Sequence, residues 1–134
     1  MAERFPSCQP LEGVGRTVAV PSDEENRTIP CRLIWKSGNK GPEDCNGVFL
    51  HIHGGGFSMG DEKSQDKLLQ MYADAGNLAV ISVGYRLSPE HPFPAGPDDC
   101  FAVAKWLVDM KPFGEQNPLR FLGGEVRRNY LILI

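Results

Sequence analysis

The sequence predicts an α/β protein with a mostly parallel sheet, and three observations support this class. Two continuous apolar runs, at residues 48–53 and 78–83, have the composition of strands that are covered on both faces. Each run is followed by a segment in which apolar residues recur at helical spacing, at residues 64–75 and 97–111. A further β-like run at residues 119–124 extends the alternation, which is typical of a parallel sheet with helical crossovers.

The chain begins with an irregular lead-in at residues 1–15, and its first regular elements are two strands. The β-rich runs RTVAV, at residues 16–20, and IPCRLIW, at residues 29–35, are separated by the polar stretch PSDEENR. They are predicted to pair with each other at one edge of the sheet. A loop of turn-forming residues, 36–47, then leads to the buried strand at residues 48–53.

Two helices are predicted from apolar spacing and from residues that favour helix ends. The first, residues 64–75, is preceded by Asp61 and Glu62, whose charges suit the positive end of a helix. Its apolar residues are Leu68, Tyr72 and Ala75, with Leu69 and Met71 alongside. The second, residues 97–111, has Pro97 in its first turn and Pro112 just after its end. Its predicted buried stripe consists of Phe101, Ala104, Leu107 and Val108.

Composition limits the possible functions. The 134 residues suffice for one domain or part of one, and a net charge of −3 without a basic stripe argues against nucleic acid as a partner. No signal peptide and no apolar run of membrane-spanning length is found, so a cytoplasmic protein is expected. The four cysteines lie far apart and are predicted to be buried free thiols: Cys8, Cys31, Cys45 and Cys100.

The most informative stretch is LHIHGGGFSMG, residues 50–60, in which a predicted strand runs into three glycines. Glycine lets the backbone approach a ligand closely, and the N–H groups of such a turn suit a phosphate or a transition-state oxyanion. A dinucleotide site is one alternative, although the next strand lacks the acidic residue that usually ends it. His51 and His53 point to the same side of the strand, but no third metal ligand has suitable spacing, so no metal is predicted.

Three motifs resemble the hormone-sensitive-lipase-type carboxylesterases of the α/β-hydrolase superfamily. They are HGGGF at residues 53–57, YRLSPEHPFPA at residues 85–95 and FLGG at residues 121–124, and their order and spacing match over about residues 14–125. The resemblance implies a carboxylic ester hydrolase with a small-molecule ester substrate and no cofactor. It also implies the strand order 1-2-4-3-5, which leaves the strand at residues 119–124 at an edge of the sheet.

The resemblance further implies roles for individual residues. The oxyanion-hole residues would be Gly54, Gly55 and Gly56. The backbone N–H groups of Gly55 and Gly56 would bind the substrate's carbonyl oxygen as it becomes negative, and Gly54 would shape the turn. His53 would hold the loop rather than transfer protons. Arg86 is interpreted as structural, with a pairing to Glu90 as one option.

The nucleophile that the resemblance requires is missing. The family's elbow commonly reads Gly-Gly-(Asp/Glu)-Ser, whereas here Gly123-Gly124-Glu125 is followed by Val126. Arg127 and Arg128 stand where the tight turn needs small residues, and no other serine is expected to have elbow flanks. We therefore interpret residues 1–134 as a single partial domain, truncated at the elbow, whose tail at residues 126–134 departs from the family.

Without the serine, or the acid and histidine that follow it in the family, the chain is predicted to be inactive as an esterase. Two alternatives to an esterase-family chain remain. One is a non-catalytic interaction protein that keeps the partial fold, and the other is a dinucleotide-binding domain. The sequence does not indicate an oligomeric state.

Overall fold

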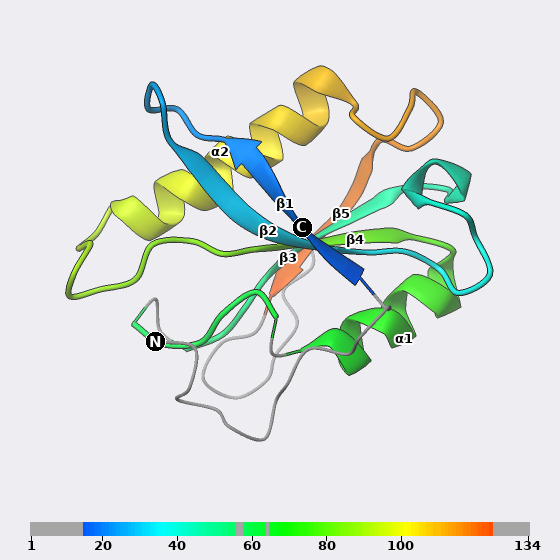
Figure 1. Cartoon of the computed structure of the whole chain (residues 1–134), viewed down its shortest axis with the longest axis horizontal. Helices are drawn as coiled ribbons and strands as arrows, with labels where there is room; N and C mark the ends of the chain where they lie inside the picture. Colours follow the sequence, from blue (N-terminus) through cyan, green and yellow to red (C-terminus); the bar gives the residue numbers. More distant parts are fainter. Residues whose placement is uncertain (1–14, 56–57, 64, 125–134) are drawn as a thin grey trace.

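A five-stranded sheet forms the centre of the molecule, with the strand order β1-β2-β4-β3-β5 (Figure 1). The computed structural model describes residues 15–55, 58–63 and 65–124. The strands are β1 (Gly15–Pro21), β2 (Thr28–Ile34), β3 (Val48–Ile52), β4 (Ala79–Val83) and β5 (Leu119–Gly124). The pairs β1-β2 and β2-β4 are antiparallel, whereas β3 lies parallel to both β4 and β5. The α/β class and the predicted strand order are confirmed, and the sheet of the described residues is mixed.

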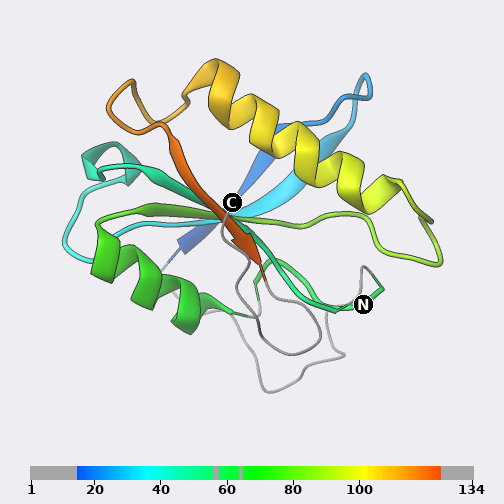
Figure 2. The same ribbon diagram turned by 180° about the vertical axis from the view of Figure 1, so that it is seen from behind.

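Two helices cover opposite faces of this sheet, as Figures 1 and 2 show from the two sides. α1 (Asp66–Gly76) connects β3 to β4, and α2 (Ala95–Met110) connects β4 to β5. A short 3-10 helix, η2 (Pro42–Asp44), lies in the loop before β3. Every residue of β4 is buried, because each helix covers one face of this central strand. The continuous apolar run at residues 78–83 predicted this double burial correctly.

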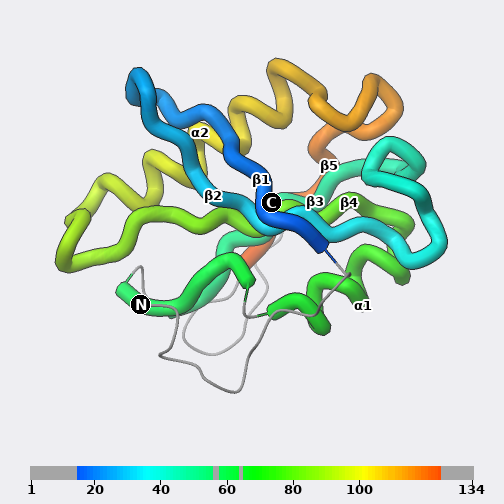
Figure 3. Tube along the Cα trace, viewed as in Figure 1, coloured from blue at the N-terminus to red at the C-terminus, as the bar shows by residue number. Residues whose placement is uncertain are grey.

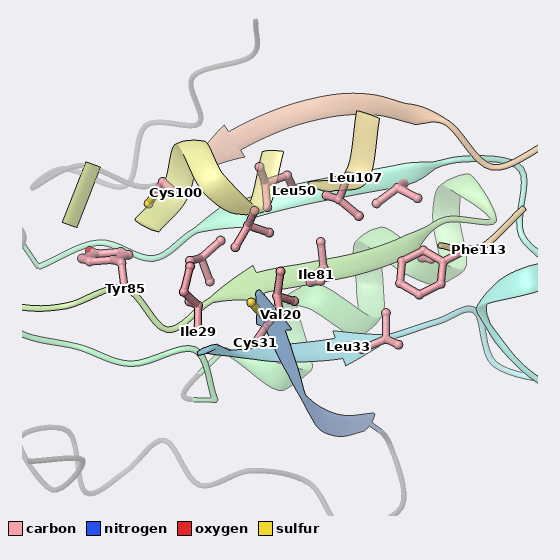
Figure 4. Close-up of a cluster of buried hydrophobic side chains, with 14 of the residues drawn as sticks. Val20, Ile29, Cys31, Leu33, Leu50, Ile81, Tyr85, Cys100, Leu107 and Phe113 are labelled. Atoms are coloured by element: carbon pink, nitrogen blue, oxygen red, sulfur yellow. The ribbon is translucent and has the colours of Figure 1, made fainter. Parts of the chain in front are cut away.

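The hydrophobic core is divided by the sheet into two clusters. The larger cluster lies between the sheet and α2, where Leu50 and Ile81 meet Leu107 (Figure 4). The smaller cluster lies on the α1 face, where Phe49 packs with Leu69. Side chains alternate along a strand, so the neighbours Phe49 and Leu50 of β3 belong to different clusters.

The buried face of α2 differs from the predicted stripe, and the helix begins two residues before the predicted position. Leu107 is buried as predicted, but Phe101 and Val108 are 71% and 55% exposed. The buried residues of α2 are Gly96, Asp99, Cys100, Val103 and Leu107. The prediction for Phe101 and Val108 was wrong because the face toward the sheet includes a charged residue, which an apolar pattern does not identify.

The first helix, α1, begins at Asp66, two residues after the predicted start, and its buried residues include only one of the apolar residues named from the sequence, Leu69. Leu69 and Ala73 are buried, whereas Ala75 is exposed. Asp66, the first residue of the helix, is also buried. Its carboxylate accepts two hydrogen bonds from Arg32 of β2, at 2.9 and 3.2 Å, so an ion pair attaches the start of α1 to the sheet.

A second buried carboxylate, Asp99, attaches α2 to the β1-β2 hairpin. It accepts hydrogen bonds from Arg27 at 2.6 Å and from two nitrogen atoms of Arg86 at 3.1 Å. Burial raises the pKa of the Asp99 carboxyl, but the hydrogen bonds from Arg27 and Arg86 outweigh it and hold the pKa below its ordinary value. Arg86 also donates to Glu24 at 3.0 Å. Arg86 therefore pairs with Asp99 and Glu24, which corrects the suggested pairing with Glu90.

Three of the four cysteines lie within the described residues, and all three are free and buried, as predicted. Burial raises the pKa of Cys31 and of Cys100 to about 12, so both thiols stay protonated at neutral pH. The prediction for Cys8 falls outside the described residues.

Candidate functional site

The carboxyl ends of β3 and β5 lie side by side, and glycines are found at both. Ile52 of β3 is in register with Gly124 of β5, and Gly54 and Gly55 follow β3 closely. The chain leaves β3 through α1 toward β4, whereas β5 lies on the other side of β3. In open α/β sheets, ligands bind in the crevice that forms where connections diverge in this way. By this rule, the candidate site is the position between the glycine turn after β3 and the end of β5, and we refer to it below as the crevice.

The turn after β3 has a backbone that only glycine can adopt comfortably. Gly55 has φ +123°, and a Cβ atom there would collide with the carbonyl oxygen of Met59. The backbone N–H and the hydroxyl of Ser58 both donate to the Gly55 carbonyl, each at 3.2 Å. Gly60 has φ +92° and lies against Gly54, since a Cβ atom would come 2.7 Å from the Gly54 oxygen. The turn thus folds back on itself and has no room for side chains at positions 55 and 60.

His53 is buried at the base of this turn and holds it through its ring. Nδ1 of His53 lies 2.9 Å from the Gly54 carbonyl oxygen, which can only accept, so this hydrogen bond places a proton on Nδ1. The ring stacks on Tyr85, with centroids 4.2 Å apart and planes 10° apart. The Tyr85 hydroxyl donates to the His53 carbonyl at 2.6 Å. These contacts attach the turn to the segment after β4.

The predicted oxyanion residues fall partly within the described chain. Gly54 and Gly55 lie at the crevice, in a turn whose close contacts leave their backbone little freedom. Such fixed N–H groups can stabilise a negative charge without reorganising. Gly56 lies outside the described residues, as does the nucleophile position, Val126.

One serine was misjudged from the sequence. Residues 56–60 read Gly-Phe-Ser-Met-Gly, so Ser58 does have the flanks of the pattern G-x-S-x-G, and the prediction that no serine has them is wrong. The pattern requires a sharp strand-to-helix turn. Ser58 instead lies between the end of β3 at Ile52 and the start of α1 at Asp66, and its hydroxyl donates to the Gly55 carbonyl. The sequence pattern G-x-S-x-G is therefore present, but Ser58 does not lie at a strand-to-helix turn.

His51 is placed in the sheet and away from the glycine turn. Its ring is fully buried, and Nδ1 lies 2.9 Å from the Ser82 hydroxyl of the neighbouring strand. Among the residues that the structure describes, no group of three or more His, Cys, Asp or Glu side chains is arranged to hold a metal ion.

Glu62 lies near the candidate site, and its burial there was not predicted from the sequence. It was expected to favour the start of α1, but the helix begins at Asp66, and Glu62 lies in the preceding loop with only 8% of its surface exposed. It lines a pocket of about 200 Å³ that also includes His53 and Tyr85. Its flanking residues, Asp61 and Lys63, are both charged, so no apolar pattern could have indicated burial.

Comparison with known proteins agrees with this geometry. A family model described as the alpha/beta hydrolase fold matches residues 49–125. The chain belongs to this family, as the motifs predicted. The solved structure of the Pyrobaculum calidifontis esterase is similar, with a TM-score of 0.70 and 27% identity over 87% of this chain and 36% of that one.

Curated relatives include esterases of bacteria. Esterase LipI of Mycobacterium tuberculosis is 35% identical over 106 residues, which cover 75% of this chain and 31% of LipI. The ethyl acetate hydrolase of Pseudomonas putida is 35% identical over 86 residues, which cover 64% of this chain and 27% of that one. This chain thus spans about a third or less of the length of these relatives. Within the described ranges, no helix is both long and apolar enough to cross a membrane.

Proposed function

We propose that residues 15–124 form the front part of a carboxylic ester hydrolase, with the turn after β3 as its oxyanion loop. One observation carries this proposal: Gly55 has a glycine-only backbone, without room for a side chain, beside the crevice between β3 and β5. The N–H groups of this turn are suited to stabilise the oxygen that becomes negative when an ester is attacked. The name of the Pseudomonas relative, ethyl acetate hydrolase, supports a small ester as the substrate.

We further propose that the 134-residue chain does not turn over esters by itself. Val126 occupies the position after Gly124-Glu125 where the family places its serine, and Ser58 lies in a loop rather than at an elbow. Loss of the serine of such a triad costs roughly a millionfold in rate, because serine and histidine act as one unit. The oxyanion loop would then stabilise a charge that no serine at the end of β5 generates.

Hydrolysis of p-nitrophenyl acetate and butyrate by the purified chain tests the second proposal. The expected rate equals that of buffer alone, and it stays the same in the Ser58→Ala variant. Turnover that a serine-directed phosphonate abolishes, with the label on Ser58, would show that the loop serine is a nucleophile and would overturn the proposal.

A hybrid enzyme tests the first proposal separately. Residues 1–124 of this chain replace the matching residues of Esterase LipI, so that LipI supplies everything after the end of β5. The hybrid is expected to hydrolyse the same esters. A folded hybrid without activity would favour the non-catalytic alternative, whereas stabilisation of the chain by a dinucleotide would favour the third alternative, which family membership already makes the weakest.

A further inference from the structure

A pocket beside the glycine turn has a composition that the ester-hydrolase proposal does not use. It has a volume of about 200 Å³, equal to roughly six or seven water molecules at about 30 Å³ each. Its lining residues are His53, Gly60, Asp61, Glu62, Lys63, Gly84, Tyr85 and Leu87. These follow β3 and β4, so the pocket lies on the β4 side of β3, whereas the crevice of the candidate site lies on the β5 side. We refer to it below as the Glu62 pocket.

Glu62 lines this pocket with only 8% of its surface exposed, and no other residue of the described chain donates a hydrogen bond to its carboxyl group. Its charged neighbours are Lys63, Asp61 and Arg32. Arg32 already donates to Asp66 with two nitrogen atoms. Burial raises the pKa of Glu62, and the hydrogen bond from its own backbone N–H, followed by the nearby positive charges, reverses this only in part. A largely buried carboxylate of this kind gains from a partner that adds a positive charge and further hydrogen bonds.

The backbone leaves space around this carboxyl group. A Cβ atom at Gly84 would come 2.7 Å from Oε2 of Glu62, so the side chain occupies room that glycine provides. At the opposite wall, a Cβ atom at Gly60 would come 2.8 Å from Nδ1 of His53. The two glycines therefore provide the room that the side chains of Glu62 and His53 occupy in the wall of the pocket.

The walls of the pocket indicate which chemical group would enter. The charged lining residues are Asp61, Glu62 and Lys63, and the nearby Arg32 is already paired with Asp66, so the balance of charge around the pocket is negative and favours a positive ligand. The stacked rings of His53 and Tyr85 and the side chain of Leu87 add aromatic and apolar surface. An ammonium group supplies several hydrogen-bond donors and a charge, and its alkyl stem suits the apolar wall.

We propose that the Glu62 pocket binds the protonated amino group of a small aliphatic amine, with Glu62 as its anionic partner. This inference does not depend on ester hydrolysis, because binding is measurable in the chain without any turnover. Glu62 is the anchoring residue, and the His53–Tyr85 stack forms part of the wall beside its ligand.

Titration of the full chain with n-butylammonium tests the proposal, followed by amide chemical shifts of Gly60 and Gly84. The matched probes are n-butanol, which keeps the stem without the charge, and butyrate, which reverses the charge. Saturable shifts are expected with n-butylammonium, at least about tenfold weaker binding with n-butanol, and none with butyrate. Equal binding of butyrate, or no saturable binding of n-butylammonium, would overturn the proposal.

Two further measurements assign the binding to Glu62. Glu62→Gln keeps the size of the side chain and is expected to weaken n-butylammonium binding at least about tenfold, whereas the exposed control Glu25→Gln leaves it unchanged. In the unmodified chain, the pKa of the Glu62 carboxyl, followed by ¹³C NMR, is expected to fall when n-butylammonium saturates the pocket. An unchanged pKa at saturation, or equal affinity in Glu62→Gln, would place the amine elsewhere and refute the proposal.

Discussion

The loops at the two ends of the parallel strands are held in different ways (Figure 3). At the amino ends, on the right of the figure, residues 36–47 and 111–118 are joined by side-chain hydrogen bonds. Asn117 donates to the carbonyls of Pro42, Glu43 and Phe113 at distances between 3.0 and 3.2 Å. At the carboxyl ends, glycine turns adjoin a pocket that contains a carboxyl group without a donor from another residue of the described chain.

This difference associates the amino ends of the strands with stability and the carboxyl ends with function. At the amino ends, the amide of Asn117 donates to backbone carbonyls on both sides and so joins the loop before β3 to the turn after α2. At the carboxyl ends, the chain uses a glycine-only backbone at Gly55 and Gly60, and it buries most of Glu62. Such local costs are typical of sites shaped for a ligand. Changes at the carboxyl ends should therefore affect activity and binding most, and changes at the amino ends should affect stability.

The largest expected effect is on catalysis. In the hybrid enzyme, Gly55→Ala places a Cβ atom against the Met59 carbonyl and distorts the oxyanion loop. Loss of one oxyanion donor costs about 10²–10³ in rate, so kcat/KM for p-nitrophenyl butyrate should fall by that factor. The matched control is Gly38→Ala in the amino-end loop, because Gly38 has φ +92° but a Cβ atom there would meet nothing within 4 Å.

Gly38→Ala should keep full activity, since it adds similar backbone strain without a collision and far from the site. Equal losses of activity in the two variants would show that any strained glycine acts through stability. The contrast between the two ends would then have no functional meaning.

Much of the fold follows from the sequence because strand signals are continuous and local. Each predicted strand agrees with the structure to within one residue at either end, and HGGGF marked the turn at the crevice. The burial predictions that were wrong involve charged residues, which are buried because they pair with residues distant in the sequence. Asp99 lies on the core side of α2 because Arg27, 72 residues away, pairs with it, and this rotates Phe101 and Val108 into solvent.

The candidate site shows the same division. Three adjacent glycines predict a turn that needs a glycine-only backbone, and Gly55, just after β3, has one. Burial of Glu62 could not be predicted, because it results from the approach of the loop after β4 to the loop after β3. Ser58 shows the opposite error, since its flanking glycines match a motif while the three-dimensional turn does not.

The next effect concerns stability at the amino ends. Asn117→Ala removes the amide whose two N–H groups reach three carbonyls, and the Phe113 carbonyl loses this donor, so the free energy of unfolding should fall by about 1–3 kcal/mol. Gln116→Ala is the neighbouring control, because Gln116 makes one exposed hydrogen bond of 3.3 Å, to the Glu43 carbonyl. Urea unfolding of both variants measures the difference. If Asn117→Ala unfolds like the control, the amino ends are not the stabilising end of the sheet.

The smallest expected effect is a gain in stability at the carboxyl ends. Burial raises the pKa of Glu62, so the folded chain holds a proton there more tightly than the unfolded chain does. The resulting penalty is present when the pH is above the folded pKa. It shrinks as the pH falls through that pKa and is absent below the ordinary value of about 4.3. Glu62→Gln removes this titration and should therefore raise the free energy of unfolding at pH 7.5 but not at pH 4. Urea unfolding at both pH values, with the exposed Glu25→Gln as control, measures this difference.

A saturating concentration of n-butylammonium should stabilise the unmodified chain more than the Glu62→Gln variant, because the amine supplies a positive partner for the Glu62 carboxylate. A variant that loses stability at pH 7.5 would show instead that the charged carboxylate supports the fold, and the carboxyl ends would then resemble the amino ends.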